Sequence, residues 1–211
     1  MKSNFIIPIV AILLSATAIV VFFKSDVVRP SSKGKSENSE QITDDRTTFW
    51  EIYPELVITT EGQSFNDQVK ILDTQQNQIP IIDVLRNVKH RNILVFRFSN
   101  YDCDLCIKKT LPILINYIKK NPENIKIIVD GMTERNFRIK FKDIQDSFTK
   151  NNSVLFLKEQ NFNFPLENKN IPFFFLLDNI ERKISRVFIP SKSYPQQTIT
   201  YLKNITGLLN E

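Results

Sequence analysis

The sequence predicts an α/β domain with a central mixed sheet, and three observations predict it. Apolar runs of strand length alternate with segments whose apolar residues recur every three or four positions, as they do in helices. The first of the central strands, Ile93–Phe98, leads into Cys103 and Cys106, and a segment with helical spacing follows them. The chain is also 42% hydrophobic, which is enough to build a core.

The elements before the central strand are short. Order is expected to begin near Trp50. Two apolar segments, Val69–Asp73 and Ile79–Asp83, are separated by a polar stretch and predict a β-hairpin. Val84–Val88 is expected to form a helical turn that leads into Ile93–Phe98.

The second half of the chain continues the alternation. Ile125–Val129 is predicted to be a buried strand parallel to Ile93–Phe98, because a whole helix connects the two. Thr133–Thr149 is predicted to be a helix capped by Thr133, and its stripe of phenylalanines is expected to be core. The remaining expected elements are a strand at Ser153–Leu157, an Asn-rich loop at 161–170, an antiparallel hairpin of Phe173–Leu177 and Ile184–Ile189, and a helix at Thr198–Leu209.

Cys103 and Cys106 are the only two cysteines, and they form a C-x-x-C motif at the expected start of a helix. The unpaired N–H groups and the positive end of the dipole at a helix N-terminus favour a thiolate over a thiol. The thiolate is the form that attacks disulfides, so a C-x-x-C at this position indicates redox chemistry. Cα atoms this close along a helix lie roughly 5–6 Å apart, which is within disulfide range.

Three other interpretations of the two cysteines remain open. They could form an inert local disulfide, although so short a loop removes little entropy from the unfolded chain. A structural zinc site needs four ligands, whereas the chain has no second C-x-x-C and a single histidine, His90. Two thiolates and His90 could bind Cu(I), but His90 lies in a polar turn where a solvated histidine is the simpler interpretation. No metal and no cofactor is therefore expected.

A further motif lies downstream, where Ile171 and Pro172 precede the run Phe-Phe-Phe-Leu-Leu-Asp. Together with the strand, the C-x-x-C and the helix, this motif resembles the thioredoxin-like superfamily over about residues 61–209. Within it, the chain looks like the membrane-anchored thiol-disulfide oxidoreductases related to peroxiredoxins and to the cytochrome-maturation thioredoxins (TlpA-like). The resemblance implies a three-layer sandwich around a mixed sheet, preceded by the N-terminal hairpin and a transmembrane helix.

The resemblance also implies roles for site residues. Cys103 would be the nucleophile, and Cys106, one turn into the helix, would resolve the mixed disulfide. Pro172 would follow a cis peptide bond and lie against the cysteines, and the backbone of Ile171 would pair with an extended substrate. Ile171 and Pro172 are therefore the expected substrate-binding residues.

The sequence departs from the resembled family at three places near the cysteines. Asp102 stands where the family usually has an aromatic residue, and Asp104-Leu105 stands where it usually has Gly-Pro or Pro-Pro. On the strand, Phe96 and Arg97 lie where thioredoxins bury a carboxylate that accepts a proton. We expect the carboxylates of Asp102 and Asp104 to disfavour a Cys103 thiolate, and Arg97 to favour it if its side chain points toward the site.

The N-terminal part of the chain predicts a membrane anchor. Phe5–Phe23 carries no charge, and a helix of this length spans roughly 28 Å, about the thickness of a bilayer's hydrocarbon core. We therefore divide the chain into a transmembrane anchor or uncleaved signal at 1–24, a polar, flexible tether at 25–47, and a thioredoxin-like domain at 48–211. A retained anchor is favoured over a cleaved signal because polar chain does not follow the candidate cleavage site.

The orientation of the anchor has two opposing indications. Lysine and arginine residues are more frequent after Phe5–Phe23 than before it, which taken alone would leave the domain in the cytoplasm. The resembled family instead implies a single-pass protein whose bulk is extracytoplasmic, at the periplasmic face of the inner membrane. We adopt that orientation.

These observations predict a membrane-tethered thiol-disulfide oxidoreductase that acts on protein or peptide disulfides and takes electrons from a redox donor, with a reducing role favoured. The alternative is a non-catalytic thioredoxin-like module that binds a peptide or a membrane partner. A peroxidase is disfavoured because Asn100-Tyr101-Asp102-Cys103 lacks the Thr-x-x-Cys of peroxiredoxins. The net charge of +5 is dispersed and forms no nucleic-acid motif, so no nucleic acid is expected.

Overall fold

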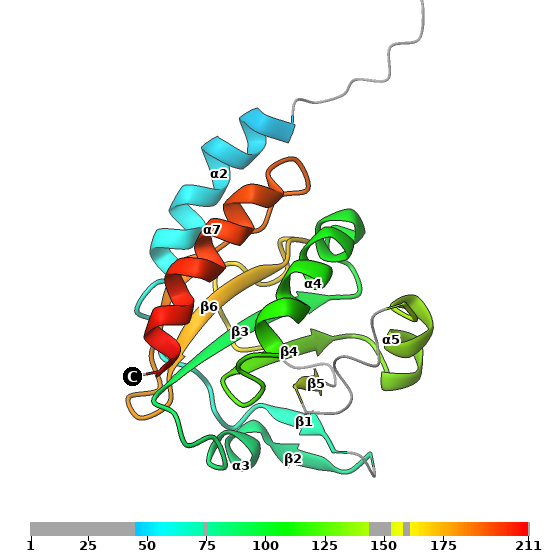
Figure 1. Cartoon of the computed structure of the whole chain (residues 1–211), viewed down its shortest axis with the longest axis vertical. Helices are drawn as coiled ribbons and strands as arrows, with labels where there is room; N and C mark the ends of the chain where they lie inside the picture. The colour runs from blue at the N-terminus through cyan, green and yellow to red at the C-terminus, as the bar shows by residue number, and fades with distance from the viewer. Residues whose placement is uncertain (1–44, 74–75, 144–152, 158–160, 211) are drawn as a thin grey trace, which may run out of the picture. The chain divides into compact units, whose positions relative to one another are not determined.

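The computed structural model describes residues 45–73, 76–143, 153–157 and 161–210, and the side chains from residue 53 onward (Figure 1). The expected anchor at 1–24 lies outside these ranges, and so does the expected flexible tether at 25–47 except for residues 45–47, which belong to the helix Asp45–Thr60, so the ordered part begins earlier than predicted. Within them, the chain contains no helix that is both long enough and apolar enough to cross a bilayer.

In the described ranges, seven strands form one sheet in the order β2-β1-β5-β4-β3-β6-β7. Both ends of this order carry antiparallel hairpins, and the strands between them include two parallel pairs, so the sheet is mixed as predicted. The strands are β1 (Lys70–Leu72), β2 (Gln78–Pro80), β3 (Asn92–Ser99), β4 (Ile125–Asp130), β5 (Val154–Leu157), β6 (Phe173–Asp178) and β7 (Ile184–Phe188).

Strand β3 lies at the centre of the fold, as its apolar sequence predicted. Every residue of β3 after Asn92 is buried. It pairs in parallel with β4, with Val95 opposite Lys126, and antiparallel with β6, with Val95 opposite Phe175. The antiparallel pairing brings the C-terminal end of β3 beside the start of β6, so the segments around the cysteines and around Pro172 meet at one edge.

The helices of the described ranges cover the two faces of this sheet. Their bounds are α2 (Asp45–Thr60), α3 (Ile81–Leu85), α4 (Asp104–Ile118), α5 (Glu134–Lys140), α7 (Pro195–Thr206) and a final 3₁₀ turn η1 (Gly207–Asn210). Helix α4 connects β3 to β4, and α7 follows the β6–β7 hairpin, in the order that the sequence predicted (Figure 1).

Alternation along β3 divides the core into two layers. Leu94, Phe96 and Phe98 face the cluster formed with α4, α5 and α7. Ile93 and Val95 face the opposite cluster, which α3, the 162–171 segment and the half-buried side chains of α2 complete. Because strand side chains alternate between faces, one strand fills both layers and the sheet is sandwiched between helices.

Several elements differ from their predictions; for example, the C-terminal helix α7 begins at Pro195 rather than Thr198, and the helical turn expected at Val84–Val88 is the helix Ile81–Leu85. The second strand of the hairpin is shorter than Ile79–Asp83, because helix α3 begins at Ile81. Helix α5 begins after Thr133 as expected but ends at Lys140, and the rest of the predicted helix runs into residues 144–152, outside the described ranges. Helix α2 was not predicted, since its sequence shows no helical stripe and contains Pro54.

The edge strand β7 is partly covered by a single carboxylate. Glu61, just after α2, accepts hydrogen bonds from the backbone N–H groups of Arg186 at 3.0 Å and Val187 at 2.6 Å. On α7, the Tyr201 hydroxyl donates to the carbonyl oxygen of Arg186 at 2.7 Å. Polar backbone groups of β7 are thereby bonded to side chains of the same chain.

Candidate active site around the C-x-x-C motif

Cys103 and Cys106 form a disulfide at the start of α4, with their Cα atoms 5.3 Å apart. Cys103 is the N-cap residue of the helix, and its sulfur accepts a hydrogen bond from the backbone N–H of Cys106 at 3.3 Å. Both cysteines are partly exposed. The predicted pairing and the predicted position at the helix N-terminus are confirmed.

The turn between β3 and the cysteines is held by a buried aspartate. The carboxylate of Asp102 accepts from the backbone N–H of Ser99 at 2.7 Å and from its hydroxyl, also at 2.7 Å. The expected effect of Asp102 on the Cys103 thiolate stays a prediction; the structure shows this carboxylate buried and turned toward Ser99 and Arg97. Its negative charge is thus partly compensated within the fold.

Asp104 is engaged in a similar way on the exposed side. It forms ion pairs with Lys108 at 2.8 Å and with Lys140 of α5 at 2.9 Å. Hydrogen bonds from these two ammonium groups hold the pKa of Asp104 below its usual range. The neighbouring side chains Tyr101 and Leu105 are exposed, so the disulfide is bordered by apolar surface that a partner could cover.

The segment before β6 reaches the cysteines through the backbone. The N–H of Cys103 donates to the carbonyl oxygen of Asn170 at 3.1 Å, which places the Asn170–Pro172 segment against the dithiol as expected. The peptide bond before Pro172 is trans, and none of the described peptide bonds is cis, so the predicted cis-proline is wrong. Ile171 and Pro172 are both buried, and their predicted contact with a substrate remains a prediction.

The conformation of this segment follows from its asparagines. Asn163, Asn168 and Asn170 have φ values of 65°, 62° and 57°, in the left-handed region. Asparagine is among the residues that enter this region most readily. The buried side chains of Phe162, Phe164 and Leu166 anchor the segment in the core between these turns.

Beneath the site, Arg97 lies in a buried cluster of charges that includes two carboxylates the sequence did not indicate. Its guanidinium pairs with Asp102 at 3.4 Å, with Asp130 of β4 at 3.3 Å and with Glu167 at 3.4 Å. It also lies over the ring of Phe173, 5.7 Å from the centroid. Periodicity gave no reason to expect Glu167, since it lies in an irregular loop, and Asp130 was visible only as the polar end of a buried strand.

Burial changes the acidity of both carboxylates. Desolvation raises the pKa of Glu167, although Arg97 and backbone N–H groups of the 162–164 turn act in the opposite direction. Desolvation likewise raises the pKa of Asp130, again opposed by Arg97. Nε of Arg97 and Oε1 of Glu167 lie 3.4 Å apart. Both atoms are buried, and neither makes a hydrogen bond within the described residues.

Metal binding was one of the alternatives to redox chemistry. Among the described residues, no group of three or more His, Cys, Asp and Glu side chains is arranged to hold a metal ion.

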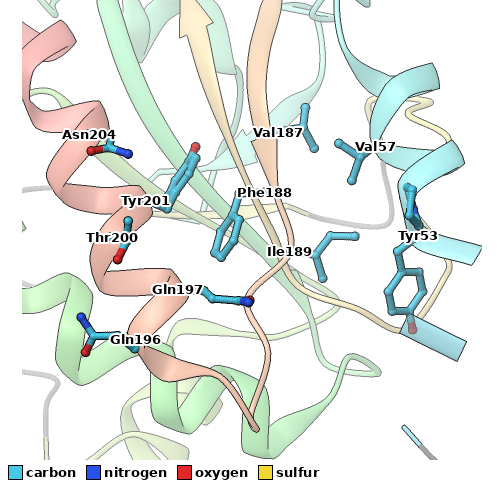
Figure 2. Close-up of a pocket in the computed structure, with 11 residues that line it drawn as sticks. Tyr53, Val57, Val187, Phe188, Ile189, Gln196, Gln197, Thr200, Tyr201 and Asn204 are labelled. Atoms are coloured by element: carbon cyan, nitrogen blue, oxygen red, sulfur yellow. The ribbon is translucent and has the colours of Figure 1, made fainter. Parts of the chain in front are cut away.

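A separate groove of about 570 Å³ lies between α2 and α7, over β7. In Figure 2, Tyr53 and Val57 approach it from α2, and Gln197 and Tyr201 from α7. None of the residues that line this groove belongs to the C-x-x-C motif or to the segment around Pro172.

The chain was compared with known proteins and structures. No protein-family model matches it, and no curated protein matches its sequence. Solved structures do match. A thiol:disulfide interchange protein from Bacteroides sp. is 18% identical over 68% of this chain and 90% of its own, with a TM-score of 0.43. A thioredoxin-like protein from Porphyromonas gingivalis is 17% identical, covering 71% and 95%, with a TM-score of 0.42. The peroxidoxin BcpB from Mycobacterium tuberculosis is 12% identical, covering 69% and 97%, with a TM-score of 0.44.

Likeness at these identities and TM-scores does not establish an activity. The mixed α/β fold follows from the chain's own topology. A β-α-β unit, with the cysteines after its first strand, is followed by an antiparallel hairpin and a closing helix.

Proposed function

We propose that this chain, whose strand order and C-x-x-C position are those of the thioredoxin-like superfamily, is a thiol-disulfide oxidoreductase. The observation that supports the proposal best is the pair Cys103–Cys106 at the start of α4, bonded to each other and partly exposed. A pair at such a position cycles between disulfide and dithiol, because the helix N-terminus stabilises the thiolate of its cap residue.

The proposed reaction moves two electrons from the dithiol to a substrate disulfide. The Cys103 thiolate attacks one substrate sulfur, forms a mixed disulfide and releases the other substrate sulfur as a thiolate. Cys106, after losing its proton, attacks the Cys103 sulfur and releases the second substrate thiolate. The enzyme is left with the Cys103–Cys106 disulfide, and a donor dithiol returns it to the reduced form by the reverse exchange.

The proposed substrates are protein or peptide disulfides in an extended conformation. Exposed Tyr101 and Leu105 border the disulfide and offer apolar contact. The segment of Asn170, Ile171 and Pro172 lies against Cys103 and would supply backbone pairing to the substrate chain.

The first test is to trap the mixed disulfide. In a Cys106→Ser variant the second exchange cannot occur, so we expect substrate proteins to remain linked to Cys103 and to be released by dithiothreitol. The wild type should reduce insulin with dithiothreitol well above the background rate. The matched control is Cys103→Ser, which keeps one thiol but should trap nothing and reduce nothing.

The same experiment tests the second candidate, a non-catalytic binding module. That candidate is favoured by Arg97, which occupies the strand position of the carboxylate in the resembled family. A folded wild type that reduces no insulin, together with a Cys106→Ser variant that traps nothing, would contradict the oxidoreductase and leave the binding module.

We further propose that the domain is tethered to a membrane and lies outside the cytoplasm, at the periplasmic face of the inner membrane. The proposal is supported by the uncharged span Phe5–Phe23 in the sequence. Alkaline phosphatase fused after Glu211 should be active, because this enzyme forms its disulfides outside the cytoplasm. A cytoplasmic reporter at the same position is the control, and activity of that reporter alone would reverse the orientation.

A further inference from the structure

Arg97 connects the two segments that meet at the dithiol. The residue is 1% exposed and lies on β3, before the turn to the cysteines. It pairs on one side with Asp102, the residue before Cys103, and on another with Glu167, in the segment that leads to Asn170. These two partners are far apart in the sequence, so the arginine links loops that local structure does not connect.

Each partner holds its own loop. Asp102 accepts the N–H and the hydroxyl of Ser99 and so fixes the turn that presents Cys103. Glu167 accepts the N–H of Phe164 at 3.1 Å and so closes the turn of 164–167. A displacement of either carboxylate would therefore move the loop that contains it.

The two loops touch at one hydrogen bond, from the Cys103 N–H to the carbonyl oxygen of Asn170. Asn168 and Asn170 both adopt positive φ between Glu167 and this bond, so the path from Glu167 to Asn170 consists of two tight turns. The position of Asn170 relative to Cys103 consequently depends on where Glu167 is held.

An arginine is better suited than a lysine to bind the carboxylates of both loops. Its planar guanidinium presents five N–H donors in a fixed arrangement and stays charged at any accessible pH. Three carboxylates approach this one group from β4 and from both loops. A lysine has three donors on one compact ammonium and lacks the extended planar arrangement by which different nitrogens of Arg97 face different carboxylates.

We propose that Arg97 is a positioning residue for the dithiol: through Asp102 and Glu167 it holds the Asn170–Pro172 segment in register with Cys103, and so aligns an incoming peptide disulfide. The proposal rests on the proposed function for its consequence in substrate binding. The positioning itself is a property of the folded chain and can be measured without a substrate.

The test compares Glu167→Gln with Asp130→Asn in the full chain. Both variants remove one carboxylate from Arg97, but Asp130 lies on β4 and belongs to neither loop. The first measurement is amide hydrogen exchange at Cys103 in the disulfide form. We expect Glu167→Gln to accelerate this exchange by about tenfold, and Asp130→Asn to leave it within about twofold of the wild type.

The second measurement is the kinetics of insulin reduction. Glu167→Gln should raise the KM by about fivefold with little change in kcat, because it disturbs substrate alignment and leaves the sulfur chemistry intact. The reaction of the reduced protein with a small aromatic disulfide, which needs no pairing segment, should keep its wild-type rate. A purely structural role of Glu167 would affect both reagents alike.

Four outcomes decide the proposal. Wild-type exchange at Cys103 in a folded Glu167→Gln variant would overturn it, and so would equal acceleration in both variants. Faster exchange in Glu167→Gln alone supports it, even if the wild type reduces no insulin, in which case the proposed function fails and the positioning stands. If Glu167→Gln does not fold, Arg97→Lys replaces it in the same measurements, and wild-type exchange at Cys103 in that variant overturns the proposal.

Discussion

The carboxyl group of Glu167 makes the stability of the fold depend on pH. Burial raises its pKa in the folded chain, so the unfolded chain releases this proton at a lower pH than the folded chain does. The stabilisation from the retained proton is complete below the unfolded pKa of about 4.3 and is lost as the pH rises through the folded pKa.

Glutamine at this position does not titrate. We therefore expect the free energy of unfolding of Glu167→Gln to increase relative to that of the wild type as the pH rises from about 4 to 7. Urea unfolding at both pH values measures the difference. Asp130→Asn should show the same sign, since burial also raises the pKa of Asp130. If the stability of Glu167→Gln relative to the wild type fell as the pH rises, the raised pKa of Glu167 would be contradicted.

The sequence was least informative about the positions and conformations of single residues outside a local motif. The pair Cys103–Cys106 was predicted because its motif is local and its chemistry depends on a helix start, which spacing reveals. Glu167 could not be predicted, because its burial results from long-range packing around Arg97. The cis conformation of the peptide bond before Pro172 was predicted from the family resemblance alone, and that prediction was wrong.

At the scale of elements, helix α5 depends on its N-terminal cap. The hydroxyl of Thr133 accepts from the N–H of Asn136 at 3.2 Å, and the helix has only seven residues. Thr133→Ala should therefore lower the free energy of unfolding by about 1 kcal/mol. Chemical denaturation measures the loss.

Thr133→Ser is the matched control, because it keeps the hydroxyl and should cost much less than alanine. An alanine variant as stable as the serine variant would show that the cap contributes little and that α5 is held by other contacts, including the packing of Phe137. That phenylalanine is buried against Phe98 and Phe156, so both contributions exist in the fold.

Helices were predictable where an apolar stripe repeats and less so elsewhere. Helix α4 has such a stripe, and its buried residues include Leu111, Leu114 and Ile118. Helix α2 lacks one, because only some of its side chains pack on the core, and it contains Pro54. Tertiary packing against β7 supplies what the local sequence does not indicate.

At the scale of the whole molecule, the order of the central elements and the two hairpins could be predicted, but the attachment of the N-terminal hairpin to the sheet could not. A helix between two apolar runs leaves room for the crossover that a parallel pair needs, so the parallel pairing of β3 and β4 could be predicted from the sequence. The pairing of β1 with β5, where Ile71 faces Leu157, joins the N-terminal hairpin to the central strands. Nothing in either short strand specifies the other, because strand pairing depends on distant parts of the chain.

The carboxylate of Glu61 has a consequence for how copies of this protein meet. A sheet whose last strand offers free N–H groups can be extended by a strand from another molecule, which is a common route to aggregation. On β7, the N–H groups of Arg186 and Val187 are already bonded to Glu61. This edge is thus protected by one acidic side chain together with the Tyr201 hydroxyl and the backbone of Gly62 and Gln63, which bond to Arg186 and Ile184. At Arg186 and Val187, a neighbouring chain finds an acceptor in the place where it would need two donors.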